Sequence, residues 1–273
     1  MVSHFFSWQK FPEEMWNHFA AEFRDNGAGN LVLLHTWAVR LIQEEGFFEK
    51  IQKLCRENRV SITGAHAPFG PDWDLTAVNE DFLLKHEKLP GLLKKLGVKS
   101  CTYHIGLFSG TQEESRAHAL ATLKRLVSCG EKNDVVIAIE NAEHPGGACD
   151  ELLYYRSQID SPYLGFCYDS GHANVNGGAI AVLEKMLADI VVCHIHDNPG
   201  KGDWHMVPGT GSVPWEQVTV MLKKAPRLME IENESNVLCS KYSYREVCRW
   251  FDRFDAEIFK NRQILTNENI RCN

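Results

Sequence analysis

A short stretch of the chain carries side chains that are able to bind a metal ion. It contains five candidate ligands within twelve residues, directly after the apolar run 190–193: His194, His196, Asp197, Asp203 and His205. Because alternate side chains of a strand point to the same face, His194 and His196 project together. Asp203 and His205 repeat that spacing. Imidazole nitrogens and carboxylate oxygens suit zinc, manganese or iron, so this density of donors favours a metal site over a structural role.

Titratable side chains also occur where five other predicted strands end. They are His66, His104, Glu140, Asp169 with His172, and Glu230 with Glu232. Any one of them could be a polar group that a nearby loop amide satisfies. Six consecutive strands that each deliver such a residue at the same level are poorly explained by chance. Carboxylates that converge in one pocket repel one another unless they are protonated or bound to a cation, so the pattern predicts one or more divalent ions.

Strand-like and helix-like stretches alternate along the whole chain. The predicted strands span residues 2–7, 30–36, 60–66, 99–105, 134–140, 163–169, 190–196 and 227–232. The predicted helices are Glu13–Arg24, Arg40–Asn58, Glu80–Leu96, Glu113–Glu131, Asp150–Gln158, Gly178–Ala188, Pro214–Lys224 and Tyr242–Phe259. Alternating β and α elements imply a parallel sheet, and eight such units in 273 residues match the size of a (β/α)8 barrel.

A doubly wound open sheet is the alternative architecture. Such a sheet usually carries a glycine fingerprint after its first strand, and this chain has none. We also find no linker, low-complexity segment or block of charge that would divide the chain. We therefore predict an α/β protein, with residues 1–273 forming a single TIM-barrel domain whose active site lies where the strands end.

The residue pattern of two predicted strands supports an inward orientation of their carboxylates. If Glu140 points into the barrel, alternation places Ala138 inside as well. In the same way Asp169 shares its face with Cys167, whereas Tyr168 faces the helices. Small residues inside and bulky residues outside are typical of a barrel strand.

Bulk composition limits the classes of protein that this chain could represent. With 44% hydrophobic and 24% charged residues, the chain is typical of a globular protein. A net charge of -7 argues against a broad nucleic-acid-binding face. No apolar run approaches the roughly 20 residues of a membrane span, and residues 1–10 do not have the pattern of a signal peptide. Nine cysteines without a C-x-x-C pair are typical of reduced thiols in a cytoplasmic protein.

Four runs of residues carry a resemblance to a known superfamily. They are Tyr168–Asn174, His194–Asn198, Asp203–His205 and Pro208–Gly211. These runs resemble the xylose isomerase-like TIM-barrel superfamily, and they are most similar to its group of sugar phosphate isomerases and epimerases, to which endonuclease IV is related. The resemblance extends from about His66 to Glu232, and the strand count carries it over most of the chain.

The resemblance implies a set of metal ligands. In the sugar epimerases of the superfamily, one divalent ion is bound by four residues from four strands, and the matching residues are Glu140, Asp169, His194 and Glu230. The register of the last strand is open, because Glu230 and Glu232 share a face; we prefer Glu230, which follows an apolar pair. We expect one ion, Zn²⁺ or Mn²⁺, with up to three ions as the upper limit.

The activity that the resemblance implies belongs to carbohydrate metabolism. We expect a metal-dependent isomerase or epimerase that acts on a sugar or sugar phosphate through an enediolate. The ion would act as a Lewis acid on the substrate carbonyl, while Glu140 and Glu230 would remove and return the proton. His172, His196 and His205 would hold substrate oxygens or a further metal ion, with His196 in a substrate-facing or supporting role. Such barrels often pair through their helices, so a homo-oligomer is compatible with the sequence.

Two other functions remain open at this level. The first is a zinc-dependent phosphodiester hydrolase, an AP endonuclease of the endonuclease IV kind, in which further metal ligands would fall on His66, His104, His172, Asp203 and His205. The loop 67–74 is acidic rather than basic, which disfavours nucleic acid as a partner. The second is a barrel that binds a metal or ligand without catalysing a reaction, since fold alone does not fix function.

Overall fold

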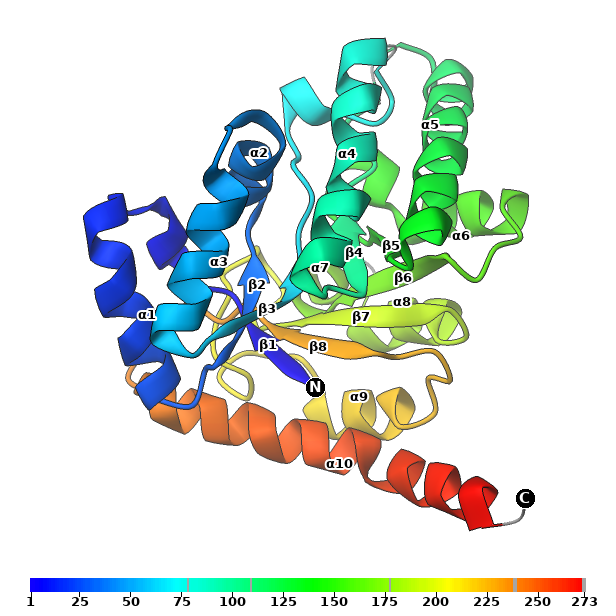
Figure 1. The fold of residues 1–273 in the computed structure, drawn as a ribbon. Coiled ribbons are helices and arrows are strands. Elements are labelled where there is room, and N and C mark those ends of the chain that lie inside the picture. The colour runs from blue at the N-terminus through cyan, green and yellow to red at the C-terminus, as the bar shows by residue number, and fades with distance from the viewer. Residues whose placement is uncertain (78, 109, 177, 238–239, 272–273) are drawn as a thin grey trace.

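Eight parallel strands follow one another around a barrel, as the sequence predicted (Figure 1). They are β1 (Val2–His4), β2 (Asn30–Leu33), β3 (Ser61–Ala65), β4 (Ser100–Tyr103), β5 (Val136–Glu140), β6 (Leu164–Asp169), β7 (Ile190–Ile195) and β8 (Glu230–Asn233). The computed structural model describes residues 1–77, 79–108, 110–176, 178–237 and 240–271. The strand order is β3-β2-β1-β8-β7-β6-β5-β4, so that β3 and β4 lie at the two ends of the sheet.

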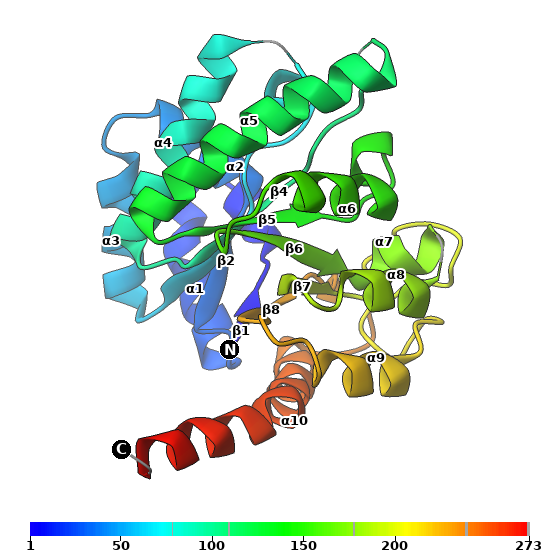
Figure 2. The ribbon, with the colours of Figure 1, turned by 90° about the vertical axis from the view of Figure 1, so that its right-hand side faces the viewer.

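Helices cover the outside of the strands (Figure 2). They are α1 (Trp16–Asp25), α2 (His35–Gln43), α3 (Phe47–Asn58), α4 (Glu80–Leu96), α5 (Gln112–Asn133), α6 (Cys149–Gln158), α7 (Ser170–Val175), α8 (Ala179–Met186), α9 (Trp215–Leu222) and α10 (Tyr244–Arg271). The predicted helix 40–58 is two helices, because Gly46 adopts a φ of 78° between α2 and α3. The short helix α7 was not predicted from the sequence.

Local sequence signals set the ends of the helices. Asn79 caps α4 by accepting hydrogen bonds from the backbone N–H groups of Asp81 and Phe82. Thr111 and Glu114 form a reciprocal capping box at the start of α5. These caps satisfy N–H groups that have no partner inside the helix. They therefore fix the residues at which α4 and α5 begin.

The two ends of the sheet approach each other where β3 meets β4. Within the described residues, the ladder between these strands consists of one parallel bridge, between His66 and Thr102. The backbone N–H of Ala67 donates to the carbonyl oxygen of Thr102 at 2.8 Å. The barrel is therefore nearly closed, and its weakest junction lies beside two of the predicted site histidines, His66 and His104.

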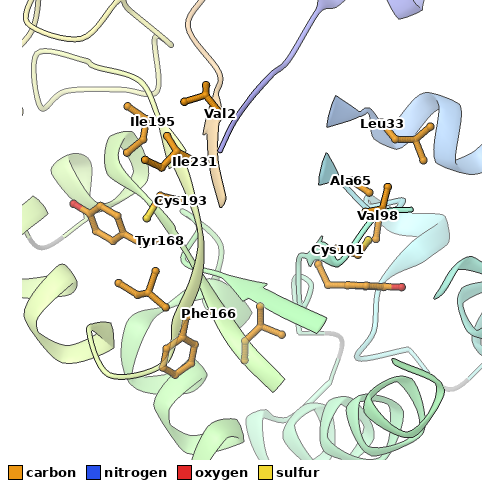
Figure 3. Close-up of a cluster of buried hydrophobic side chains, with 14 of the residues drawn as sticks. Val2, Leu33, Ala65, Val98, Cys101, Phe166, Tyr168, Cys193, Ile195 and Ile231 are labelled. Carbon is orange, nitrogen blue, oxygen red and sulfur yellow. The ribbon is translucent and has the colours of Figure 1, made fainter. Parts of the chain in front are cut away.

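Apolar side chains lie in two separate clusters, one outside and one inside the strands. Figure 3 shows Phe166, Tyr168 and Cys193 within the large buried cluster that packs strands against helices. Ala138 and Cys167 belong instead to a small second cluster, which confirms the predicted inward orientation of these residues. The inner cluster fills only part of the barrel, and polar side chains fill the rest.

Two further properties of the described residues bear on the sequence predictions. The seven cysteines among them are free, and Cys101 and Cys193 are completely buried, as expected for packing residues. No helix in the described ranges combines the length and the apolar character that crossing a bilayer requires.

Candidate metal centre

Glu140, the last residue of β5, is the centre of a cluster of imidazoles. Its Oε2 lies 2.8 Å from Nε2 of His104 and 3.3 Å from Nε2 of His66. Its Oε1 lies 3.1 Å from Nδ1 of His194 and 3.4 Å from Nδ1 of His172. These histidines come from different elements. His66 directly follows β3 and His104 directly follows β4. His194 lies on β7, and His172 lies in the first turn of α7. One buried carboxylate therefore joins four elements of the barrel.

Asp169, the last residue of β6, faces the same cluster and caps α7. Its Oδ1 accepts a hydrogen bond from the backbone N–H of His172 at 2.7 Å, and its Oδ2 lies 3.1 Å from Nε2 of His196. The side chain of Asn141 exchanges two hydrogen bonds with the backbone of Asp169, at 2.8 and 2.9 Å. The Asn141 amide therefore holds the Asp169 carboxylate next to Glu140.

The two histidines of β7 contact the carboxylates through different nitrogen atoms. Nδ1 of His194 lies 3.1, 3.3 and 3.9 Å from oxygens of Glu140, Glu234 and Asp169. His196 uses Nε2, which lies 3.1 Å from Asp169 and 3.7 Å from Glu234. The ring of His196 is fully buried and does not line the cavity above the cluster, so it supports the carboxylates.

Glu230 lies apart from the imidazoles, inside the barrel at the start of β8. The hydroxyl of Ser3 donates to its Oε1, and the hydroxyl of Ser100 donates to its Oε2 at 3.1 Å. Burial and the neighbouring Glu232 raise the pKa of Glu230 to about 8. The sequence placed this strand at 227–232, whereas β8 begins at residue 230. Glu230 is therefore the first residue of β8, and Glu234 is the residue that directly follows its end.

Glu232 and Glu234 approach the cluster from β8 and from the residue that follows it. Oε2 of Glu232 lies 3.0 Å from Nε2 of His194, and Oε1 of Glu234 lies 3.3 Å from Nδ1 of the same ring. The backbone carbonyl of Glu234 also lies 3.1 Å from Nδ1 of His205. Glu234 therefore lies at the imidazole cluster, whereas the hydrogen bonds of Glu230 are with Ser3 and Ser100.

The loop between β7 and α9 carries Asp203 and His205 into the cluster. Oδ2 of Asp203 lies 2.9 Å from Nε2 of His205 and 3.4 Å from Nε2 of His172. His205 adopts a φ of 47°, which is uncommon for a residue other than glycine. Its ring stacks on that of His196, with centroids 4.1 Å apart and planes 15° apart.

Asp197, two residues after the end of β7, organises this loop. Its carboxylate is completely buried and accepts five hydrogen bonds. The donors are the backbone N–H groups of Asn198 at 2.8 Å, Val213 at 3.1 Å, Gly209 at 2.8 Å and Gly211 at 3.0 Å, and Nε1 of Trp215 at 2.8 Å. A carboxylate with so many donors anchors a loop that has little regular structure of its own.

The electrostatics of the cluster favour positive charge. Burial opposes ionisation of Glu140, but the charges of His194 and His104 hold the pKa of its carboxyl well below the usual range. Burial also opposes charge on His205, yet its hydrogen bond to Asp203 and the negative charges of Glu234 and Asp203 together raise the pKa of the imidazole to about 9. The cluster is therefore a place where cations are stabilised.

The donors of the cluster fit a divalent metal ion. Three groups whose ligand atoms lie within 4.8 Å of one another are His66 with His104 and Glu140, Asp169 with His194 and Glu234, and His196 with His205 and Glu234. Among the described residues, the buried Nδ1 of His196 and Oδ1 of Asp203 have no hydrogen-bond partner. Mixed nitrogen and oxygen donors of this kind suit Zn²⁺ or Mn²⁺.

A cavity of about 730 Å³ opens above the cluster. Its floor includes Glu140, His172, Asp203, His205 and Glu234, and its walls include Phe5, Phe69, Trp204 and Lys10. Trp204 is 60% exposed, so a large apolar surface is available to a ligand. The cavity has the volume of a small-molecule site, with polar groups converging at one end.

Sequence reasoning missed Glu234 and Asn141, and it counted Asp197 among the candidate ligands, whereas the Asp197 carboxylate anchors the loop. Glu234 shares the period-two spacing of Glu230 and Glu232, so the sequence indicates that it lies on their face of the strand. The spacing does not indicate how deep in the barrel each of the three side chains lies. Asn141 directly follows Glu140, and Asp197 directly follows His196. No spacing rule separates such loop-organising residues from exposed polar neighbours.

Comparison with known proteins gives partial matches among curated sequences. An uncharacterised protein of Methanocaldococcus jannaschii is 30% identical over 138 residues, which cover 47% of each chain. The D-psicose 3-epimerase of Enterocloster bolteae is 26% identical over 116 residues, which cover 41% of this chain and 37% of that enzyme. The chain thus spans less than half the length of the curated relatives that it matches.

Solved structures share the fold over nearly the whole chain. A D-tagatose 3-epimerase-like protein has a TM-score of 0.68 and 23% identity, with 91% of this chain and 93% of that chain covered. The D-psicose 3-epimerase from Clostridium cellulolyticum H10, solved with D-tagatose, has a TM-score of 0.72 and 12% identity, with 94% and 98% covered. The sequence model of one family, described as xylose isomerase-like TIM barrel, matches residues 16–254. The chain therefore belongs to the xylose isomerase-like TIM barrel family.

Proposed function

We propose that this protein is a divalent-metal-dependent isomerase or epimerase of a sugar or sugar phosphate. One observation carries the proposal: Glu140 and Glu234 both line the cavity, and both approach Nδ1 of His194, at 3.1 and 3.3 Å. Two carboxylates that share one cation site and face one cavity are the pair that a proton transfer next to a carbonyl requires.

Four residues would hold the cation in this proposal. They are Glu140, Asp169, His194 and Glu234, which meet around Nδ1 of His194. A bound Zn²⁺ or Mn²⁺ would polarise the substrate carbonyl and stabilise the negative charge of an enediolate. Asn141 fixes Asp169, and His66 with His104 fixes Glu140, so the ligands are held before substrate arrives.

The two glutamates would move the proton. One carboxylate removes the proton from the carbon next to the carbonyl, and the other returns a proton to the same carbon or to its neighbour. Glu140 carries imidazole contacts on both oxygens, whereas Glu234 lies beside the His205 ring. Each carboxylate thus has a neighbouring imidazole that stabilises its ionised form.

The cavity walls and the relatives both support a sugar as substrate. Phe5, Phe69 and Trp204 offer apolar surface to the C–H faces of a sugar, and Asn236 offers a polar group beside them. A D-psicose 3-epimerase is among the curated relatives, and D-tagatose is the ligand in one related structure.

Metal content together with isotope exchange tests the proposal. Purified protein is analysed for bound metals, and the loaded protein is incubated in deuterated water with ketohexoses, ketopentoses and their phosphates. One ion per chain and incorporation of deuterium at the carbon next to the carbonyl are expected. Protein that stays metal-free in metal-supplemented buffer, or that exchanges no deuterium with any substrate, contradicts it.

A specific observation also favours a second function, hydrolysis of phosphodiesters. Two further donor groups flank the first site: His66 with His104, and His172 with Asp203 and His205. Together these groups offer places for up to three zinc ions, which would generate a hydroxide and stabilise the leaving oxygen. Three zinc ions per chain with nicking of an abasic-site duplex would establish this function. Lys10 is the only lysine or arginine among the described residues that line the cavity, which favours the sugar.

A further inference from the structure

The ring of His194 has different surroundings at its two nitrogen atoms. Nδ1 faces the oxygens of Glu140 and Glu234, which are proposed to bind the cation. Nε2 faces away from them, with Oε2 of Glu232 at 3.0 Å and the hydroxyl oxygen of Thr102 at 3.3 Å. The ring is completely buried, so water does not replace either set of partners.

We propose that Glu232 is a positioning residue that holds His194 with its Nε2–H toward Glu232, leaving the lone pair of Nδ1 for the metal. A neutral imidazole has one N–H donor and one lone pair, and only the lone pair binds a cation. A carboxylate that accepts the N–H therefore selects the tautomer, orients the ring and strengthens it as a ligand. The inference rests on the metal site of the proposed function.

The surroundings of Glu232 place its buried carboxylate beside the ring of His194. Its side chain is 1% exposed, and its Oε2 makes no hydrogen bond among the described residues, although Nε2 of His194 lies 3.0 Å from it. A buried carboxylate without a partner is costly, so the approach of His194 is the contact that offsets the burial of Glu232. Gly64 makes room for it, because a Cβ at that position would overlap with Oε1 of Glu232.

A neighbouring glutamate provides a matched control. Glu230 lies two residues earlier on β8, is 4% exposed, and is hydrogen bonded to Ser3 and Ser100 instead of an imidazole. Glu232→Gln and Glu230→Gln therefore make the same chemical change on the same face of the same strand. Only the first one removes the carboxylate beside His194.

Zinc affinity, measured by competition with a chromogenic chelator, tests the role of Glu232. We expect Glu232→Gln to weaken binding roughly 10–100-fold and Glu230→Gln to stay within about threefold of wild type. Equal affinities for wild type and Glu232→Gln, or equal losses in both variants, overturn the inference. Absence of zinc binding by the wild type contradicts the proposed function itself, which separates the two failures.

The tautomer of His194 is measurable in the wild-type protein, so the test does not depend on how the variants fold. Histidine labelled with ¹⁵N is incorporated, the protein is loaded with Zn²⁺, and long-range ¹H–¹⁵N correlations report which ring nitrogen carries the proton. A protonated Nε2 and a metal-bound Nδ1 are expected for His194. A protonated Nδ1 overturns the inference.

Discussion

Trp215 donates a hydrogen bond from Nε1 to Oδ2 of Asp197 at 2.8 Å, and this contact joins the start of the loop after β7 to the first residue of α9. The chain between these residues carries Asp203 and His205. Backbone N–H groups on both sides of the loop also donate to the Asp197 carboxylate. The position of two cluster residues thus depends on a side chain that does not itself face the cavity.

Replacing Asp197 with Asn should destabilise the protein by about 2–4 kcal/mol, because the amide NH₂ would face donors that now point at an oxygen. Urea unfolding followed by circular dichroism measures the change. Asp160→Asn, at an exposed position, is the control and should stay within about 0.5 kcal/mol of wild type. Equal stability of Asp197→Asn and wild type would show that the loop does not depend on this carboxylate.

Glu140→Gln and Glu234→Gln should each lower the rate of deuterium exchange into a ketose substrate at least about 100-fold. The reason is that, under the proposed function, each change removes both a metal ligand and a proton-transfer group. Exchange is followed by NMR of the sugar. Glu216→Gln, on the exposed side of α9, should keep the wild-type rate. Exchange at the wild-type rate in either cavity variant would remove that glutamate from the mechanism.

Gly171→Ala should disturb the cluster through a single methyl group. A Cβ at Gly171 would overlap with the ring of His196, which is buried and stacked on His205. We expect a loss of roughly 1–3 kcal/mol in the free energy of unfolding, together with weaker zinc binding. Gly29→Ala is the control, since a Cβ there meets nothing within 4 Å. A Gly171→Ala variant as stable as the control would mean that the ring moves aside freely.

Stability should decrease as the pH falls from 6.5 toward 4, in part because of His86 on α4. Burial lowers the pKa of His86 from 6.5 to about 4 in the folded protein. The unfolded chain therefore takes up a proton in this window while the folded chain does not, which costs up to about 3 kcal/mol at its lower end. Above pH 6.5 both states are neutral at this residue, and the contribution is constant.

The pH slope of the free energy of unfolding, compared between wild type and His86→Phe, measures this effect. The variant should show a shallower slope and keep part of it, since burial also lowers the pKa of His4 to about 4. His18→Gln, at an exposed position, should retain the full slope. A His86→Phe slope equal to that of wild type would contradict the assignment.

The sequence predicted the barrel well, because the alternation of apolar strands and amphipathic helices is a local property. The helix predicted over 80–96 is α4 without any shift of its ends. The depth of side chains in β8 was not predictable in this way. Glu230, Glu232 and Glu234 are spaced by two residues, which predicts that their side chains lie on the same face of the strand. This spacing does not predict how far along the barrel axis each side chain lies. Their separate roles depend on contacts with Ser3, His194 and the cavity, which distant parts of the chain provide.

Short elements at the site were also beyond the reach of sequence patterns. Helix α7 has six residues, too few to show a helical period, and it begins because Asp169 caps it from the end of β6. The division of the predicted helix 40–58 depends on the left-handed backbone of Gly46. In both places one residue with a specific conformation or contact decides the structure.

Because β3 and β4 are joined by the single bridge between His66 and Thr102, we expect local opening of the barrel to occur at this junction. Amide hydrogens there should exchange with solvent sooner than those between β5 and β6, which are paired along four residues of each strand. His66 and His104 stand on opposite sides of this junction and converge on one carboxylate oxygen of Glu140. A second cation, bound by these two imidazoles and Glu140, would connect β3 to β4 and so stabilise the closure of the barrel.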